Sequence, residues 1–468
     1  MTARSTPGSL DERPAHNATG GAQRFPMTLE LWMALERAAY RAPRPQEQSP
    51  MDRLDDLQCV VAYNGAWGVA NLWRTLLRRQ TPHLQVVWRG PDGKTRLIAE
   101  SHVALPNREF FCSSLALALD RQRQLCERAR QRLRDRPPPD AFPVIDIADS
   151  ERPPSPTDVL RFAIRHLLGK TANKFRRAFV RSDHWGMAWR SDESSDASWS
   201  FSDRAPWRLL IPSPGDRFYA DPFLWRDAAG QVHLFFEDLP YATNKGVISH
   251  VTLDPVSGSC NAPPRVVLER PYHLSYPFLF DYAGDVFMIP ETSANRTIEV
   301  YRAAPFPDAW VHHATLMENL VAADTTLFHE AGTWWLFTTI EQGGGPNWDE
   351  LHLFHAQSPF GPWEAHPGNP VVSDCRGARM AGNVFRDEHG RLIRPAQDCE
   401  REYGAALRFW EITALSASHY AETQVAVMNA PSSRSGVHTW NRTGDITVVD
   451  IKLRALKRAK AQTGYCRF

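Results

Sequence analysis

The sequence predicts a mainly β protein, a five-bladed β-propeller that follows an N-terminal α+β and helical extension. One hairpin pattern of aromatic strands around a glycine turn recurs along the second half of the chain. From about Trp185 onward helical periodicity nearly vanishes, and short strand-like runs follow every 8 to 12 residues. The 36 prolines and 16 tryptophans among 468 residues also suit a turn-rich β fold.

The recurring hairpin is clearest in 219–238, YADPFLWRDAAGQVHLFFED, and it returns in 275–292, 323–339 and 380–398. Each copy has a glycine where a tight turn needs a positive φ. These turn glycines are Gly230, Gly284, Gly332 and Gly390. The strands before them open at Asp221, Tyr276, Asp324 and Ala381, which lie 48 to 57 residues apart. This spacing suits a blade of four short strands.

A fifth blade is expected to combine both ends of the β region. Its strands would be VHTWNRTGDITVVDIK from the end of the chain with WGMAWRS and WRLLIP from residue 185 onward. Strands contributed by both ends would remove exposed sheet edges.

The extension before the blades has mixed elements. Helical patterns are predicted at 27–41, 66–80 and 113–136, with a strand at 58–65 and a hairpin at 84–101. The strand–Asn-Gly–helix start allows a nucleotide-handling domain, but neither GxGxxG nor GKT accompanies it, so a structural appendage is preferred. The expected division is a disordered tail 1–25, an α+β/helical region 26–150, a basic amphipathic helix linker 151–184, a propeller 185–453 and a basic tail 454–468.

The linker helix has a cap at Thr157-Asp158 and carries basic residues around an apolar stripe. We expect it either to pack on the main domain with a solvated basic face or to contact an anionic membrane surface through 157–181.

The formal net charge of +1 gives no argument for a nucleic-acid partner. The seven cysteines are scattered without a CxxC pair, so neither disulfides nor a zinc site are expected. Without a signal-peptide pattern or an apolar run of about 18 residues, we expect a cytoplasmic protein, peripheral at the inner membrane if the helix binds there. No metal or cofactor is expected.

The phrases ADPFLW, HLFFED, HLSYPFLF, FMIPETS, ADTTLF, WWLFTT, FGPWEAHPGNPV and RPAQD…YG occur in one order across about 185–450. This order resembles the domain at the N-terminus of plant glucosamine inositolphosphorylceramide transferase, which also occurs alone in bacterial proteins. The plant protein carries a separate glycosyltransferase domain after this one, so the resemblance alone does not assign the plant transferase activity to this chain.

The blades are more distantly similar to arabinanase, xylosidase and invertase propellers. That resemblance implies Asp221 as base or nucleophile, Asp324 as its supporting carboxylate, and a glutamate as general acid. The fourth hairpin opens with Ala381-Gly382-Asn383, where that clan has an acidic residue nearby. This departure weakens the case for ordinary glycoside hydrolysis.

Inner-strand starts should converge on a central funnel, and the ends of the second strands should lie beside them. Glycosyl transfer or hydrolysis needs one group to take a proton or attack carbon and another to protonate the leaving oxygen. The catalytic candidates are Asp221, Asp324 and, as acid, Glu291, with Asp398 as the alternative acid. Substrate-binding candidates are Asp398, Arg394, Tyr276, His273, Gln397, Arg379, Glu237 and Tyr403. Asp398 and Arg394 could instead form a buried pair within the fourth blade.

Two functions therefore remain open. The first is a carbohydrate-active enzyme that transfers or hydrolyses a glycosidic bond on a cell-surface glycan or glycolipid. The second is a non-catalytic glycan- or glycolipid-binding module that assists a glycosyltransferase in polysaccharide biosynthesis.

Overall fold

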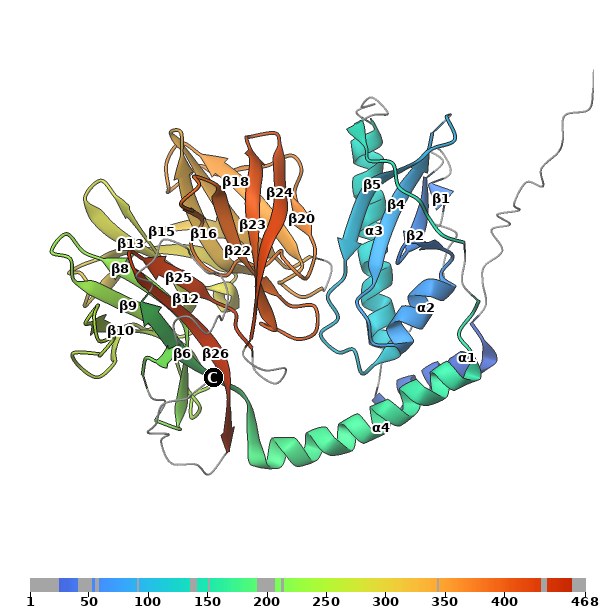
Figure 1. The fold of residues 1–468 in the computed structure, drawn as a ribbon, viewed down its shortest axis with the longest axis horizontal. Helices are drawn as coiled ribbons and strands as arrows, with labels where there is room; N and C mark the ends of the chain where they lie inside the picture. Colours follow the sequence, from blue (N-terminus) through green and yellow to red (C-terminus); the bar gives the residue numbers. More distant parts are fainter. Residues whose placement is uncertain are drawn as a thin grey trace, which may run out of the picture.

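The computed structural model describes residues 25–40, 53–54, 59–90, 92–134, 141–149, 152–191, 207–211, 214–342, 345–430 and 436–456. Figure 1 shows an α+β body built from the first part of the chain beside a larger all-β body, with one long helix running below both. The expected disordered tail, apart from residue 25, and most of the basic C-terminal tail lie outside the described residues.

The N-terminal region contains one antiparallel sheet with strand order β1-β2-β4-β5 and β3 paired to β2. Its strands are β1 (Arg53–Leu54), β2 (Cys59–Tyr63), β3 (Ala66–Trp67), β4 (His83–Arg89) and β5 (Thr95–His102). Its helices are α1 (Met27–Tyr40), α2 (Ala70–Leu77) and α3 (Phe111–Arg134). The predicted hairpin at 84–101 is confirmed as the β4–β5 pair.

Helix α4 (Pro156–Phe179) belongs to the same core. Its Val159 and Phe162 are buried with Leu29 of α1 and Phe111 of α3. The helix therefore packs on the N-terminal region, whereas the sequence suggested the main β domain as its partner.

The cap of α4 lies before the predicted pair. The Ser155 amide donates to a carboxylate oxygen of Asp158 at 2.9 Å, and the Asp158 amide donates to Oγ of Ser155 at 3.3 Å. This reciprocal arrangement is a capping box, with Pro156 at the first helical position, where its missing N–H costs nothing.

The rest of the described chain is mainly β and forms five separate antiparallel sheets. The first sheet contains β8 (Arg217–Arg226), β9 (Val232–Pro240), β10 (Val247–Leu253) and β11 (Arg265–Leu268). The second contains β12 (Ser275–Tyr282), β13 (Asp285–Glu291), β14 (Thr297–Ala303) and β15 (Trp310–Glu318), with the short 3-10 helix η2 (Ser293–Asn295) between β13 and β14. The third contains β16 (Ala322–Glu330), β17 (Thr333–Ile340), β18 (Glu350–Ala356), β19 (Glu364–Ala365) and β20 (Val372–Ser373). The fourth contains β21 (Phe385–Arg386), β22 (Leu392–Asp398), β23 (Ala406–Leu415) and β24 (Tyr420–Asn429). The four predicted hairpins are the β8–β9, β12–β13, β16–β17 and β21–β22 pairs.

The fifth sheet joins the two ends of the β region in the order β25-β26-β6-β7. Its strands are β6 (Val180–Ser191), β7 (Arg208–Leu209), β25 (Trp440–Thr443) and β26 (Ile446–Leu456). This pairing of early with late strands was expected from the sequence. Helix α4 runs directly into β6, so the helix is tied to this sheet by continuous chain.

The sheets share cores with their neighbours. One cluster joins the sheets of β8, β12, β16 and β22, with Phe223, Ile289 and Leu336 among its members. Two others join the fifth sheet to β8–β9 on one side, through Val448 and Leu234, and to β22–β23 on the other. Each sheet therefore packs against the next along the chain, and the fifth packs between the first and the fourth.

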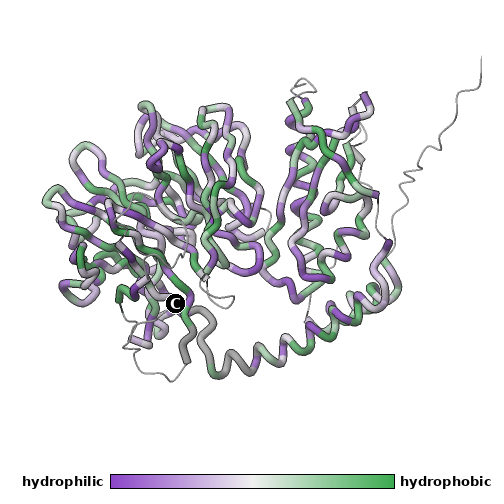
Figure 2. The backbone as a smooth tube through the Cα atoms, viewed as in Figure 1, coloured by the Kyte–Doolittle hydropathy of each residue, from purple (hydrophilic) through white to green (hydrophobic). Residues whose placement is uncertain are grey.

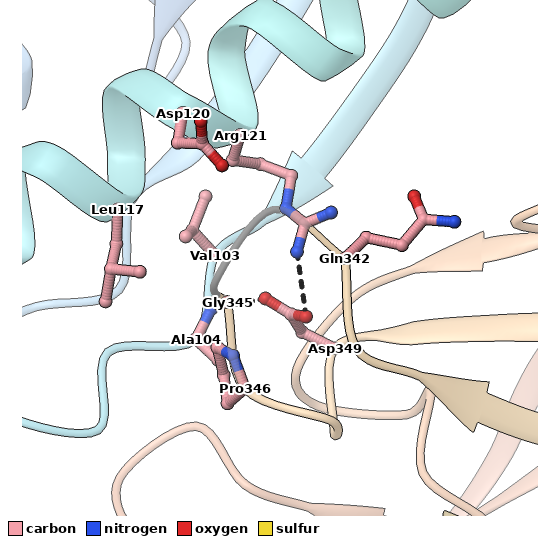
Figure 3. Close-up of a pocket in the computed structure, with 9 residues that line it drawn as sticks. All are labelled: Val103, Ala104, Leu117, Asp120, Arg121, Gln342, Gly345, Pro346 and Asp349. Atoms are coloured by element: carbon pink, nitrogen blue, oxygen red, sulfur yellow. Dashed lines mark hydrogen bonds and ion pairs between the residues drawn. The ribbon is translucent and has the colours of Figure 1, made fainter. Parts of the chain in front are cut away.

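The N-terminal region contacts the sheet of β18 through buried ion pairs. Arg121 of α3 binds Asp349 at 2.9 Å and also contacts Glu350, while Arg128 binds Glu350 at 2.5 Å. The amide of Ala104 donates to Asp349 at 3.2 Å. Figure 3 shows Arg121, Asp349 and Ala104 around a small pocket between α3 and the loop that precedes β18.

No helix in the described part of the chain is both long and apolar enough to cross a membrane. Within the same residues, no disulfide links the six cysteines.

Candidate functional site

Strands β8, β12 and β16 each contain a residue with left-handed backbone in their first half. Asp221 has φ 52°, Tyr276 φ 44° and Asp324 φ 53°, and in each case the pairing register shifts at that point. A bulky residue such as tyrosine rarely adopts this conformation, and such strain is found where function or close packing demands it. At the fourth hairpin the positive φ, 138°, belongs to Gly382, so Gly382 rather than Ala381 corresponds to the other three.

Tyr276 contacts two of the other three positions, Asp221 and Gly382. The amide of Tyr276 donates to Oδ2 of Asp221 at 3.2 Å. The Tyr276 hydroxyl accepts from the Gly382 amide at 2.8 Å and contacts the hydroxyl of Thr326 at 2.9 Å. A Cβ on Gly382 would lie 2.0 Å from the carbonyl oxygen of Trp440, so only glycine fits.

Asp221 is 5% exposed and its carboxylate is held on both sides. Its Oδ1 accepts from the Thr439 hydroxyl at 2.7 Å and lies 3.0 Å from Nε2 of His438. Burial opposes the charge, yet His438, Thr439 and Arg379 together keep the pKa of Asp221 below its usual value. Asp221 is therefore ionised at neutral pH.

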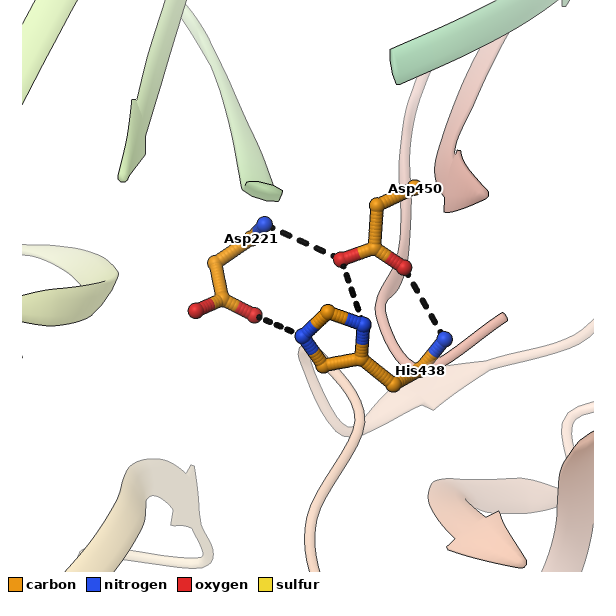
Figure 4. A group of neighbouring side chains, drawn as sticks. All are labelled: Asp221, His438 and Asp450. Atoms are coloured by element: carbon orange, nitrogen blue, oxygen red, sulfur yellow. Dashed lines mark hydrogen bonds and ion pairs between the residues drawn. The ribbon is translucent and has the colours of Figure 1, made fainter. Parts of the chain in front are cut away.

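The ring of His438 stands between two carboxylates (Figure 4). Its Nδ1 lies 3.0 Å from Oδ2 of Asp450, and Asp450 also accepts from the amides of Asp221 at 3.0 Å and His438 at 2.9 Å. Burial alone would lower the pKa of His438, but the two aspartates raise it to about 10.

Asp221, His438 and Asp450 are also close enough to suggest a metal site. The two carboxylates, however, lie 3.0 Å from opposite nitrogens of one ring, which suits a protonated imidazole between two carboxylates better than one ion bound by all three side chains. We assign the group as a charged Asp–His–Asp bridge.

The second centre is Arg379, which joins two predicted catalytic carboxylates. It contacts Asp324 through Nε at 2.5 Å and through Nη2 at 3.2 Å, and Nη2 lies 3.1 Å from Glu291. Gln397 donates to Asp324 at 2.7 Å. Burial raises the pKa of Asp324 well above its usual value; Arg379 opposes this, while Glu291 and Asp221 add to it.

Glu237 and His273 form a third pair, with Oε1 and Nε2 separated by 3.2 Å. Burial raises the pKa of Glu237, against the pull of His273, and the charge of Asp221 raises it further. The His273 side chain is 34% exposed, so this pair reaches the surface.

Aromatic rings lie against the charged groups. The Arg379 guanidinium lies 5.0 Å from the ring centre of Tyr403, and Tyr403 packs 6.0 Å from Trp348 and 5.2 Å from His438. Asn347, beside Trp348, accepts from Arg379 at 3.3 Å. Flat apolar rings beside carboxylates are a surface on which a sugar can stack.

The structure thus brings seven predicted site residues into one set of contacts, which contains Asp221, Tyr276, Asp324, Glu291, Arg379, Gln397 and Tyr403. The Glu237–His273 pair is linked to this set through the charge of Asp221.

Two predicted residues have other partners. Arg394 is fully buried and binds Glu422 at 2.6 Å, and Asp398 binds Arg408 at 2.7 Å. The expected Arg394–Asp398 pair is therefore wrong. Both residues are already used in holding β22 to its own sheet.

Sequence reasoning missed His438 and Asp450, which complete the site from the far end of the chain. A signal was present, because Asp450 interrupts the apolar run ITVVDIKL, and a carboxylate in a buried strand needs a partner.

The family described as "Glucosamine inositolphosphorylceramide transferase 1, N-terminal" matches residues 211–456. The transferase of that name from Arabidopsis thaliana is 33% identical over 228 residues, which cover 48% of this chain and 29% of the plant protein. The protein from Oryza sativa subsp. japonica is also 33% identical over 228 residues, covering 48% of this chain and 30% of its own length. The match therefore spans less than a third of these relatives.

Among solved structures, a family 117 glycoside hydrolase of Zobellia galactanivorans is 12% identical with a TM-score of 0.38, covering 58% of this chain and 91% of its own. A family 43 β-1,3-galactosidase is 10% identical with a TM-score of 0.35, covering 52% and 94%. At such scores neither likeness bears on activity. The match over 211–456 spans more than half of the 468 residues, and the chain belongs to the family of the N-terminal domain of glucosamine inositolphosphorylceramide transferase 1.

Proposed function

We propose that this protein is a carbohydrate-active enzyme that forms or cleaves a glycosidic bond on a cell-surface glycan or glycolipid. Its five sheets are, in this proposal, the blades of a closed propeller, and the network around Asp221 occupies the centre. The shared cores between successive sheets support the ring, because the fifth sheet packs against both the first and the fourth.

The proposed chemistry rests on one observation: the pKa values of two neighbouring carboxyl groups are shifted in opposite directions. The pKa of Asp221 is lowered by its partners despite burial, whereas burial raises that of Glu237. Pairs of acids whose environments separate their pKa values are how one site supplies both a base and an acid at neutral pH.

Asp221 is proposed as the base. It takes the proton of a water or of an acceptor hydroxyl while that oxygen bonds to the anomeric carbon. The departing glycosidic oxygen takes a proton from the acid, so charge and atoms balance. Water as the acceptor gives hydrolysis, and a sugar or lipid hydroxyl gives transfer.

Glu237 is the better acid on this geometry, ahead of the predicted Glu291. Glu291 lies 3.1 Å from the Arg379 guanidinium and is engaged in that ion pair. Glu237 pairs with His273 at 3.2 Å, and burial raises its pKa. Asp324 and Arg379 would then hold the neighbouring side chains of the site in place and balance the charge of the site.

A second function has its own support. Both carboxylate oxygens of Asp221 already accept hydrogen bonds within the protein, and Gly382 stands where a further acid would complete the set. A glycan- or glycolipid-binding module that assists a glycosyltransferase would need the aromatic and charged surface but no turnover.

Replacing Asp221 and Asp324 by Asn separates the two functions. The full chain is incubated with purified polysaccharides and with glycolipids plus nucleotide sugars, and turnover and binding are measured separately. An enzyme loses turnover in both variants while sugar binding persists. Equal turnover in wild type and both variants would sink the catalytic assignment, and sugar binding without any wild-type turnover would support the module.

A further inference from the structure

Helix α4 exposes large apolar side chains along one face. Leu160 is 58% exposed, Ile164 47%, Leu167 60% and Leu168 65%. These positions follow the i, i+4, i+7, i+8 spacing of a single helical face. Exposed apolar residues normally occur singly on a protein surface, so a cluster of four on one helical face needs an explanation.

This exposed face is separate from the face that holds the helix in the fold. Val159, Phe162 and His166 point into the N-terminal core and are buried. Helix α4 therefore has two apolar faces, and only one of them is needed for folding. Figure 2 shows green and purple segments alternating along the helix, as this pattern requires.

Helix α1 repeats the arrangement beside it. Leu29 and Met33 are buried, while Met27, Leu31 and Leu35 are 81%, 63% and 55% exposed. Trp32 of α1 packs 5.8 Å from Phe162 of α4, so the two helices lie together. The exposed apolar residues of α4, Leu160, Ile164, Leu167 and Leu168, are called the apolar face below.

Basic residues flank the apolar face of α4 on both sides. At 3.6 residues per turn, Arg161 and Arg165 lie along one edge of the leucine stripe and Lys174 lies along the other. The ammonium of Lys170, on the Lys174 side, lies 3.2 Å from the ring centre of Tyr40. The one acidic side chain in the first turn, Asp158, is held by the cap at Ser155. Long basic side chains at the borders of an apolar stripe can reach lipid phosphates while their stems cover apolar surface.

We propose that the apolar face docks on the surface of an anionic lipid bilayer, with α4 lying in the plane of the headgroups. An amphipathic helix with apolar residues below and basic residues at the sides binds in this way, through buried apolar area plus attraction to anionic lipids. The chemistry favours a bilayer over a protein partner, because the stripe is bordered by positive charge at both edges and carries none within it.

This docking would also orient the rest of the molecule. Helix α4 continues without a break into β6, which pairs with β26 in the fifth sheet. A membrane-bound α4 would hold the five sheets at the bilayer surface, where a lipid-linked glycan is within reach. The docking stands on the helix geometry and does not depend on the proposed catalysis.

The test is sedimentation of the full chain with vesicles of phosphatidylcholine alone and of phosphatidylcholine with phosphatidylglycerol. We expect binding to the anionic vesicles, weakened by high salt. The double variant Leu167→Ser/Leu168→Ser and the double variant Arg161→Gln/Arg165→Gln should each lower the apparent affinity about tenfold or more. All of these side chains are exposed, so the variants should unfold at the wild-type denaturant concentration.

Matched controls lie on the β region. Val256→Ser removes an apolar side chain that is 85% exposed, and Arg302→Gln removes a half-exposed basic one. Both should bind vesicles as the wild type does. The proposal is overturned if the wild type ignores anionic vesicles, or if the leucine variant binds them unchanged. A wild-type dimer that the leucine variant converts to monomer, without vesicle binding, would assign the face to a second copy instead.

Discussion

Nε2 of His438 lies 3.0 Å from Oδ1 of Asp221, and this contact joins the first sheet to the last. The same ring reaches Asp450 through Nδ1, also at 3.0 Å. One buried imidazolium thus lies between two buried aspartates and offsets one of their two negative charges, although the aspartates are more than 200 residues apart in sequence. The contact ties the packing of the last sheet against the first to the state of the proposed base.

Stability should depend on pH through His438. The pKa of this histidine is raised from 6.5 to about 10 in the folded protein, so its stabilising contribution is complete below about pH 6.5 and is lost as pH rises toward 10. In urea unfolding between pH 6 and 10, the stability difference between wild type and His438→Gln should shrink steadily. His389→Gln, at an exposed histidine, should follow the wild type at every pH. A difference that stays constant across this range would contradict a charged His438.

Arg379 should be the most costly single charge to remove. Its loss leaves Asp324 and Glu291 without their shared cation in a buried site, which destabilises proteins by about 3–5 kcal/mol. Arg379→Ala should show this in urea unfolding, and Arg379→Lys should recover part of it. Arg386→Gln, at a surface pair with Glu330, should change stability by less than about 1 kcal/mol. Similar small effects at both arginines would contradict the central role of Arg379.

Gly382 should not tolerate a side chain. Gly382→Ala combines a positive φ with a Cβ only 2.0 Å from the Trp440 carbonyl oxygen, a backbone atom that cannot rotate away. We expect a loss above about 3 kcal/mol, since left-handed backbone alone costs roughly 1–2 kcal/mol. Gly390→Ala is the matched control, because its φ is 75° but nothing lies within 4 Å of the added atom. The loss of stability in Gly390→Ala should be close to the cost of the left-handed backbone alone. Equal losses of stability in the two variants would contradict the close approach at Gly382.

The N-terminal region should stabilise the β region through Arg121. Arg121→Met leaves Asp349 and Glu350 buried beside each other, and we expect unfolding to become easier by about 3 kcal/mol or more. Glu350 keeps its ion pair with Arg128, so adding Asp349→Asn removes the uncompensated charge and should restore much of the loss. If the double variant is no more stable than the single one, charge compensation is not what holds this contact.

The strands of the β region could be predicted from the sequence, because turn glycines and aromatic strands recur at similar intervals. The repeat also placed Asp221 and Asp324 at equivalent strand starts. The repeat did not decide whether Ala381 or Gly382 is the residue of the fourth hairpin that corresponds to the strand starts of the other three. Only the observed φ of 138° at Gly382 decides between them.

The partners of buried charges were harder to predict than their positions. Arg394 and Asp398 are close in sequence on one strand, yet they bind Glu422 and Arg408 on the neighbouring strands. The His438–Asp450 bridge depends on how the last sheet meets the first, which no local pattern encodes. The exposed leucines of α4 were visible as an amphipathic pattern, but which apolar face the fold would bury was not.

The central claim is that neighbouring carboxyl groups divide the roles of base and acid, and Glu237→Gln tests it most directly. Turnover and sugar binding of this variant are compared with those of Glu291→Gln on a substrate that the wild type converts. Removing a general acid typically costs about 10²–10⁴ in rate, so Glu237→Gln should lose at least about a hundredfold in turnover with sugar binding retained. Wild-type turnover in Glu237→Gln, with the loss found in Glu291→Gln instead, would contradict the assignment.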